Sequence, residues 1–206
     1  MSTAVSALLF CLYGLSPSQQ PPPRLRVEIV FQGLPLRPHM ADAAMEELTT
    51  IWAPYGVDLH EATAEDGGRS GAFKLSVVLV DHQSGKVPRS ALGSAWFVGS
   101  SPQPTIFMYP NTIAWLISTT TVFGRPEDQW TNSLRDQVLG RAFGRALAHE
   151  IGHVLLRSRV HPGNGLMRAS YSADDLVAPD LRGFRLLTEE VMRLTRLTTT
   201  TPLGTP

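Results

Sequence analysis

The sequence predicts an α+β (mixed α/β) domain in which a twisted, mixed β-sheet is backed by two helices. Three observations lead to this class. Short strand-like segments fill the first half of the chain, one helical segment lies among them, and the longest helical segment follows them. Such an order is typical of a sheet covered by helices. With 206 residues, 43% of them hydrophobic, the chain is long enough for one well-buried domain and too short for two ordinary ones.

The first predicted strand is RLRVEIVF (24–31), where apolar and charged side chains alternate. Residues 41–52 place apolar side chains on one helical stripe that stops before Pro54, so we expect the first helix there. GVDLHE (56–61) is typical of a short strand. FKLSVVLV (73–80) is mostly apolar and β-branched, which predicts a central strand. Two more strands are expected, followed by a short helix and a loop, at 94–98, 105–109, 113–120 and 124–130.

The longest helical segment runs from about residue 134 to 157. Ser133 can cap its N-terminus, and Asp136 is favourable near that end. Small residues recur every four positions within it, and three of them are glycines that each cost about 1 kcal/mol relative to alanine in a helix interior. This ridge predicts close packing against a neighbouring element, most simply the sheet; it comprises Gly140, Gly144, Ala148 and Gly152.

We predict three parts of the chain: a signal-like apolar segment with a Pro-rich spacer (1–23), a single folded domain (24–197) and a disordered Thr/Pro-rich tail (198–206). The apolar run in the first part has 12 residues, whereas a membrane span needs about 20. It favours export, to a secreted or periplasmic location, with an uncleaved anchor or a buried segment as the alternative. Cys11, the only cysteine, lies in this run, so an internal disulfide is excluded.

The motif HEIGH offers two histidines and a glutamate at the spacing of a zinc-hydrolase helix. His149 and His153 are four residues apart, so both imidazoles leave the same helix face. Glu150 points about 100° around the helix, where a carboxylate can take the proton from a zinc-activated water. The flanking residues are uncharged, as expected for a buried metal site rather than a solvated helix.

A catalytic zinc ion needs three protein ligands and one open position, so a third ligand must follow. His161 is our preferred candidate, because it comes shortly after the expected helix end and has no evident structural role. The alternatives are acidic residues that could equally serve a turn or a helix N-terminus. They are Asp174, Asp175, Glu189 and Glu190.

Taken together, HEIGHVLLRSRVHPGNGLM resembles the metzincin clan of zinc endopeptidases, which combine H-E-x-x-H-x-x-G-x-x-H with a downstream methionine, the Met-turn. The resemblance implies a zincin fold with the motif on a long active-site helix. It assigns the first two metal ligands to His149 and His153, the general base to Glu150, the third ligand to His161 and the Met-turn methionine to Met167.

The chain departs from the metzincin pattern at two positions. Leu156 occupies the glycine position, and Arg159 occupies the position of the third histidine. His161 comes two residues later, so a longer connection is expected. Tyr171 is a possible transition-state stabiliser by analogy with the tyrosine that some members place after the methionine. The resemblance also implies that an edge strand, either 94–98 or 105–109, pairs with an extended peptide substrate.

These observations predict a zinc-dependent hydrolase of peptide bonds whose partner is a peptide or protein substrate. The alternatives are a secreted zincin-fold binding module with a structural Zn²⁺ and a zinc hydrolase of non-peptide amides. A net charge of zero gives no sign of nucleic-acid binding, and we expect a monomer without a membrane span beyond a possible N-terminal anchor. We interpret His39, His60 and His82 as structural or surface residues.

Overall fold

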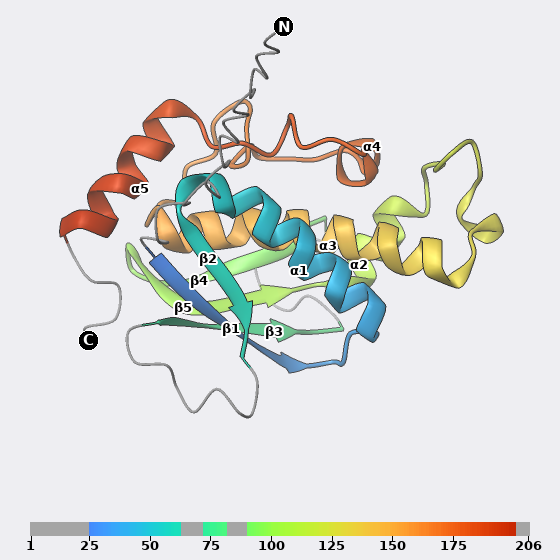
Figure 1. The fold of residues 1–206 in the computed structure, drawn as a ribbon, viewed down its shortest axis with the longest axis horizontal. Helices are drawn as coiled ribbons and strands as arrows, with labels where there is room; N and C mark the ends of the chain where they lie inside the picture. The colour runs from blue at the N-terminus through green and yellow to red at the C-terminus, as the bar shows by residue number, and fades with distance from the viewer. Residues whose placement is uncertain (1–24, 63–71, 82–89, 201–206) are drawn as a thin grey trace, which may run out of the picture.

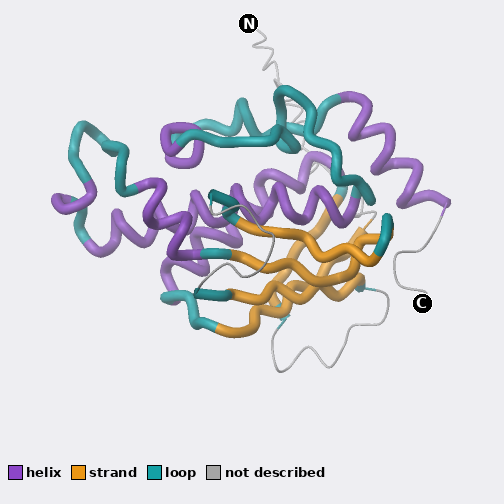
Figure 2. The backbone as a smooth tube through the Cα atoms, turned by 180° about the vertical axis from the view of Figure 1, so that it is seen from behind, coloured by secondary structure: helices purple, strands orange, loops and turns teal. Residues whose placement is uncertain are grey.

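The computed structural model describes residues 25–62, 72–81 and 90–200. The predicted signal-like segment and spacer, His82, and the end of the predicted tail therefore lie outside the described residues. In the part that is described, a five-stranded sheet forms one layer, two long helices cover one of its faces, and the C-terminal segment lies over those helices (Figure 1). The same three layers are visible from behind (Figure 2). The predicted fold class, a mixed sheet backed by two helices, is confirmed.

The strand order of the sheet is β2-β1-β3-β5-β4. Its four parallel members are β1 (Leu25–Gly33), β2 (Val57–Glu61), β3 (Phe73–Leu79) and β5 (Ser101–Met108). The antiparallel strand β4 (Gly93–Val98) lies at the edge beside β5. The prediction that 73–80 is a central strand is confirmed, because β3 is buried between β1 and β5.

Several predicted boundaries differ from the structure by three or four residues. Strand β5 begins at Ser101 rather than Thr105, because Gly99, at φ +60°, turns the chain straight back from β4. Of the two predicted edge candidates, 94–98 is the edge strand and 105–109 lies in the interior of the sheet. Helix α2 (Pro110–Ile117) starts three residues before the prediction of 113–120, with a proline in its first turn.

Helix α1 (Pro38–Trp52) and helix α3 (Asn132–Leu155) form the layer above the sheet. Thr131, not Ser133, caps α3: its hydroxyl accepts a hydrogen bond from the Leu134 amide at 3.2 Å. The predicted loop at 124–130 contains one 3₁₀ turn, η2 (Glu127–Gln129), and a second 3₁₀ turn, η1 (Ala53–Tyr55), follows α1.

The C-terminal segment contains two further helices. Helix α4 (Ala173–Val177) is a single short turn, and α5 (Thr188–Thr200) extends to Thr200, so the first three residues of the predicted disordered tail are helical. Within the described residues, no helix combines the length and the apolar character needed to cross a bilayer.

Two glycines of the ridge on α3, Gly140 and Gly144, pack against α1 and not against the sheet, which corrects the prediction. A Cβ atom at Gly140 would lie 2.6 Å from the Met40 carbonyl oxygen, and one at Gly144 would lie 2.6 Å from the Ala44 carbonyl oxygen. Both neighbours are backbone atoms of α1, which cannot move without shifting that helix. The helices thus approach closely because these two positions lack side chains.

A buried arginine ties α3 to α1 and to the C-terminal segment. Arg145 is fully buried, and its Nε donates a hydrogen bond to Glu47 Oε1 of α1 at 2.6 Å. Its two terminal nitrogens donate to the backbone oxygens of Asp175 and Asp180, at 2.6 and 2.9 Å. The guanidinium also lies 4.5 Å from the centre of the Phe184 ring. Each hydrogen-bonding nitrogen therefore has a partner, as a buried charge requires.

We predict that Gly144→Ala destabilises the fold by about 1–3 kcal/mol, although alanine has the higher helix propensity. The added methyl group would force α1 away from α3. Urea denaturation followed by circular dichroism measures the change. Gly163→Ala is the control, since a Cβ there meets no heavy atom within 4 Å. Equal stability of the Gly144 variant and the parent would contradict the proposed close packing.

We predict that Arg145→Met costs about 3–5 kcal/mol of unfolding free energy, because it leaves the Glu47 carboxylate without its buried partner. The double variant Arg145→Met/Glu47→Met should recover part of this loss. The control Arg182→Met removes an exposed arginine from its pair with Asp180 and should change stability by less than about 1 kcal/mol. A single variant as stable as the parent would show that the buried pair contributes nothing.

Candidate metal centre and active-site cleft

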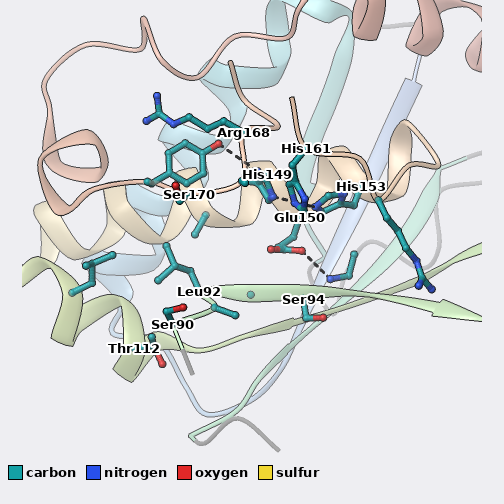
Figure 3. Close-up of a pocket in the computed structure, with 18 of the residues that line it drawn as sticks. Ser90, Leu92, Ser94, Thr112, His149, Glu150, His153, His161, Arg168 and Ser170 are labelled. Atoms are coloured by element: carbon teal, nitrogen blue, oxygen red, sulfur yellow. Dashed lines mark hydrogen bonds between the residues drawn. The ribbon is translucent and has the colours of Figure 1, made fainter. Parts of the chain in front are cut away.

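Three histidines converge above the sheet, two from α3 and one from the loop after it (Figure 3). The Nε2 atoms of His149 and His153 are 3.0 Å apart, and those of His153 and His161 are 3.1 Å apart. One ligand nitrogen from each ring lies within 4.8 Å of the others. The spacing i, i+4 on α3 places the first two rings on one face, and the loop brings the third ring parallel to His149, with ring centres 5.2 Å apart.

The outer nitrogens of the two helix histidines are held by carbonyl oxygens. His149 Nδ1 lies 2.8 Å from the Leu166 oxygen, and His153 Nδ1 lies 2.7 Å from the Ser158 oxygen. A carbonyl only accepts, so each Nδ1 carries the hydrogen and donates it. Both Nε2 lone pairs then point at the same small volume.

This arrangement fits a cation. Two unprotonated Nε2 atoms cannot hydrogen-bond to each other, and protonation is no remedy: burial lowers the pKa of His149 to about 3 and that of His153 to about 4. Burial also lowers the pKa of His161. A tetrahedral zinc ion with zinc–nitrogen bonds of about 2.0–2.1 Å separates its ligand nitrogens by about 3.3 Å, close to the observed spacings. The three histidines therefore have the chemistry and the spacing of a zinc site.

A left-handed turn at the end of α3 delivers the third histidine. The Ser158 amide donates to the His153 carbonyl at 3.1 Å, and the Arg157 amide donates to the Val154 carbonyl at 3.2 Å. These two bonds form a Schellman motif with Arg157, at φ +49°, in the position that glycine usually takes. The same turn places the Ser158 carbonyl against the His153 ring.

The turn explains both departures from the metzincin pattern. Leu156 is still helical, at φ −83°, so its position requires no glycine. Arg159 leaves the turn towards the β4–β5 hairpin, where its guanidinium donates to the Gly99 carbonyl at 2.9 Å and covers the Phe97 ring. The chain needs two more residues before His161 reaches the other histidines.

Met167 packs beneath the histidine helix. It is buried, and its side chain occupies the space that a Cβ atom at Gly152 would need. Gly152, inside the HEIGH motif, is thus the third glycine of the ridge, and its missing side chain leaves room for Met167 rather than for α1. The neighbouring Leu166 supplies the carbonyl that holds His149, so the segment 166–167 contacts α3 from below and also orients a candidate ligand.

Glu150 is buried beside the histidines and faces the edge strand (Figure 3). Its Oε2 accepts a hydrogen bond from the Ala95 amide of β4 at 2.8 Å. Burial raises the pKa of Glu150 to about 7, against the lowering effect of that hydrogen bond. No other hydrogen bond from the described residues reaches the carboxylate, so Oε1 is available on the cleft side.

Tyr171 lies on the outer side of His149. Its hydroxyl donates to the Leu166 carbonyl, the oxygen that also holds His149, and lies 3.4 Å from His149 Nδ1. The ring stacks on Phe184, with centres 5.0 Å apart, and burial raises the pKa of the phenol. The hydroxyl therefore contacts the outer nitrogen of the ligand rather than the point where the three Nε2 atoms meet.

The structure brings His161, and none of the four acidic alternatives, to the helix histidines. Asp175 closes a capping box with Ser172 at the start of α4, and Asp174 accepts from the Thr120 hydroxyl. Glu190 accepts from the Leu187 amide at 2.8 Å at the start of α5, where Glu189 also lies in the first turn.

Two of the remaining histidines can be placed. His39 lies in the first turn of α1, and His60 Nδ1 on β2 lies 3.4 Å from Asp58. Neither belongs to the histidine cluster, in agreement with their interpretation as structural or surface residues.

The histidines open into a cleft of about 600 Å³. Strand β4 forms one wall, helix α2 and the segment before β4 form an apolar end, and the chain after Met167 forms the opposite wall. The residues of the apolar end include Leu92, Trp115 and Leu116, and the side chain of Trp115 is 67% exposed. Sequence reasoning missed these lining residues and the backbone partners of the site, because no local pattern indicates which loops meet in space.

Comparison with known proteins gives a likeness in fold. No protein-family model matches the chain, and no curated protein sequence matches it. Among solved structures, the chain is similar to the crystal structure of archaemetzincin from Methanopyrus kandleri, with a TM-score of 0.52 and 10% sequence identity. The match covers 85% of this chain and 96% of that one. The chain has a zincin-like fold. At this identity the likeness shows the fold alone.

We predict that His161→Ala lowers the affinity for Zn²⁺ by about 100-fold or more, since two histidines and solvent must then hold the ion. Competition with a chromophoric chelator measures the affinity. His60→Ala is the matched control, a histidine on the sheet outside the cluster, and should bind zinc like the parent. If His161→Ala keeps the full affinity of the parent, the third ligand lies elsewhere on this zincin-like fold.

Proposed function

We propose that this protein is a zinc-dependent hydrolase that cleaves peptide bonds. The observation that carries the proposal is the convergence of three histidine Nε2 atoms next to a buried carboxylate in a cleft. A zinc ion held there would act as a Lewis acid that polarises the scissile carbonyl and acidifies water. The likeness in fold to archaemetzincin supports the same class of chemistry.

His149, His153 and His161 would hold the zinc ion through Nε2. The Leu166 and Ser158 carbonyls keep the first two rings in the tautomer with Nε2 unprotonated, because each accepts the hydrogen of Nδ1. Their hydrogen bonds also limit ring rotation. The site is thereby arranged before the ion arrives, and little ordering remains to be done on binding.

Glu150 would act as general base and then as general acid. The Ala95 amide holds Oε2 at 2.8 Å, which leaves Oε1 to take a proton from the attacking water. A pKa of about 7 suits both steps, because the group can accept the proton and then return it to the leaving amine nitrogen. Burial of the carboxylate is what brings the pKa into this range.

The substrate would be an extended peptide alongside β4. This strand is the edge of the sheet and lines the cleft through Ser94, Ala95 and Phe97. An edge strand presents backbone groups that a peptide can pair with. The amide of Ala95 is already bound to Glu150, so that residue would link the peptide-binding edge directly to the general base.

Two other functions use the same site. A binding module with a structural zinc ion would have no need for Glu150, and a zinc hydrolase of non-peptide amides would not need the edge strand. A peptide-cleavage assay separates both alternatives from the proposed function, because neither of them expects peptide bonds to be cleaved. Export from the cytoplasm and a monomeric state remain part of the proposal and rest on the sequence.

We predict that Glu150→Gln retains zinc but lowers kcat/KM for peptide cleavage by about 10²–10⁴, because the amide cannot accept the proton. Glutamine keeps an oxygen for the Ala95 amide, so the fold should not change. A peptide library analysed by mass spectrometry measures cleavage, and atomic absorption measures zinc content. The control is His60→Ala, which should cleave like the parent. A zinc-loaded parent that cleaves no peptide would contradict the proposed activity.

A further inference from the structure

Two arginines are among the described residues that line the cleft, and they differ in charge balance. Arg168 is paired: its Nη2 lies 3.0 Å from Asp175 Oδ2, and Figure 3 shows its guanidinium turned away from the histidines. Arg159 has no carboxylate partner in the part of the chain that the structure describes. Glu150 is the only acidic side chain among the described lining residues. Arg159 therefore carries a positive charge that is not paired with a carboxylate among the described residues of the cleft lining.

Arg159 is held in one orientation although it is exposed. Its Nη2 donates to the Gly99 carbonyl at 2.9 Å, and its guanidinium carbon lies 4.4 Å from the centre of the Phe97 ring. These two contacts attach it to the β4–β5 hairpin, while its backbone belongs to the turn that delivers His161. A guanidinium has five N–H donors, so one bond to Gly99 leaves most of them free.

The position of Arg159 connects it to the proposed path of the substrate. Phe97, which the guanidinium covers, belongs to the edge strand and lines the cleft. A peptide paired with β4 would pass this guanidinium. Stacking on an aromatic ring reduces the side-chain entropy that is lost when an arginine grips a carboxylate, and the planar fork matches a carboxylate in two parallel hydrogen bonds.

We propose that Arg159 selects peptide substrates that present a carboxylate beside the β4–β5 hairpin. The carboxylate is either an aspartate or glutamate side chain or the C-terminus of the substrate. This inference rests on the proposed function for its biological meaning, but binding alone tests it. Arg159 is a specificity-determining residue and takes no part in bond cleavage.

The test uses the full chain, zinc-loaded, with Glu150→Gln to prevent turnover. The probes are fluorescein-labelled octapeptides of alanine and leucine with one central glutamate or glutamine. The third probe is the glutamine peptide with a free C-terminal carboxylate. The other two probes are amidated at the C-terminus. Fluorescence anisotropy gives the Kd of each probe for Glu150→Gln alone and in combination with Arg159→Gln, Arg159→Lys or the control Arg182→Gln. Arg182 is exposed, lies outside the cleft lining and changes net charge equally.

We expect at least one carboxylate probe to bind about 10-fold more tightly than the amidated glutamine probe. Arg159→Gln should reduce this preference to less than about twofold, Arg159→Lys should retain part of it, and Arg182→Gln should leave it unchanged. Which of the two carboxylate probes shows the preference identifies the source of the carboxylate. The proposal is overturned if neither probe is preferred, or if the preference survives Arg159→Gln.

Incubating the same peptides with the parent, Glu150 intact, separates this inference from the proposed function. Acid preference that depends on Arg159 without any cleavage would uphold the binding role and contradict the peptidase. Cleavage of all three peptides at the same kcat/KM, with no effect of Arg159→Gln on any of them, would support the peptidase and overturn the role of Arg159.

Discussion

The close approach of α3 to α1 is the constraint on which the rest of the structure depends. From Ala142 to Leu155 every residue of α3 is buried, so this helix must be covered on all sides. Gly140 and Gly144 let the backbone of α1 cover one side, and the edge strand β4 reaches another through Glu150. Arg145 holds the C-terminal segment over the remaining side. His149 and His153 are held in place because the helix that carries them is packed against all of these neighbours.

The metal centre uses the same burial for chemistry. Desolvation lowers the pKa values of the helix histidines and raises that of Glu150, so the site contains neutral imidazoles and a carboxylate poised near neutral pH. In water neither shift would occur. Backbone groups of three separate segments then complete the arrangement: Leu166 and Ser158 hold the rings, and Ala95 holds the carboxylate.

The end of α3 shows how a departure from a known motif can leave the site intact. A Schellman turn places the left-handed residue at Arg157, after one more helical residue than the metzincin spacing suggests. The turn needs a positive φ and two backbone hydrogen bonds, and a non-glycine residue can adopt that conformation at a modest cost. The two extra residues carry Arg159 to the β4–β5 hairpin, so the altered spacing adds a cleft-lining cation while the third histidine still arrives.

Sequence alone determined whatever depends on local periodicity. Alternation and helical spacing predicted the five strands, α1, α2 and α3, and the i, i+4 rule placed His149 and His153 on one face with Glu150 beside them. Only the tertiary structure decided which residue joins them, which helix the glycines face, and that Arg145 anchors the C-terminal segment. Those outcomes depend on which distant segments pack together. This packing is determined by the Schellman turn, by the lack of Cβ atoms at Gly140 and Gly144, and by the buried guanidinium of Arg145. Spacing along the chain encodes local geometry, whereas packing between segments is set by three-dimensional exclusion and the need to satisfy buried polar groups.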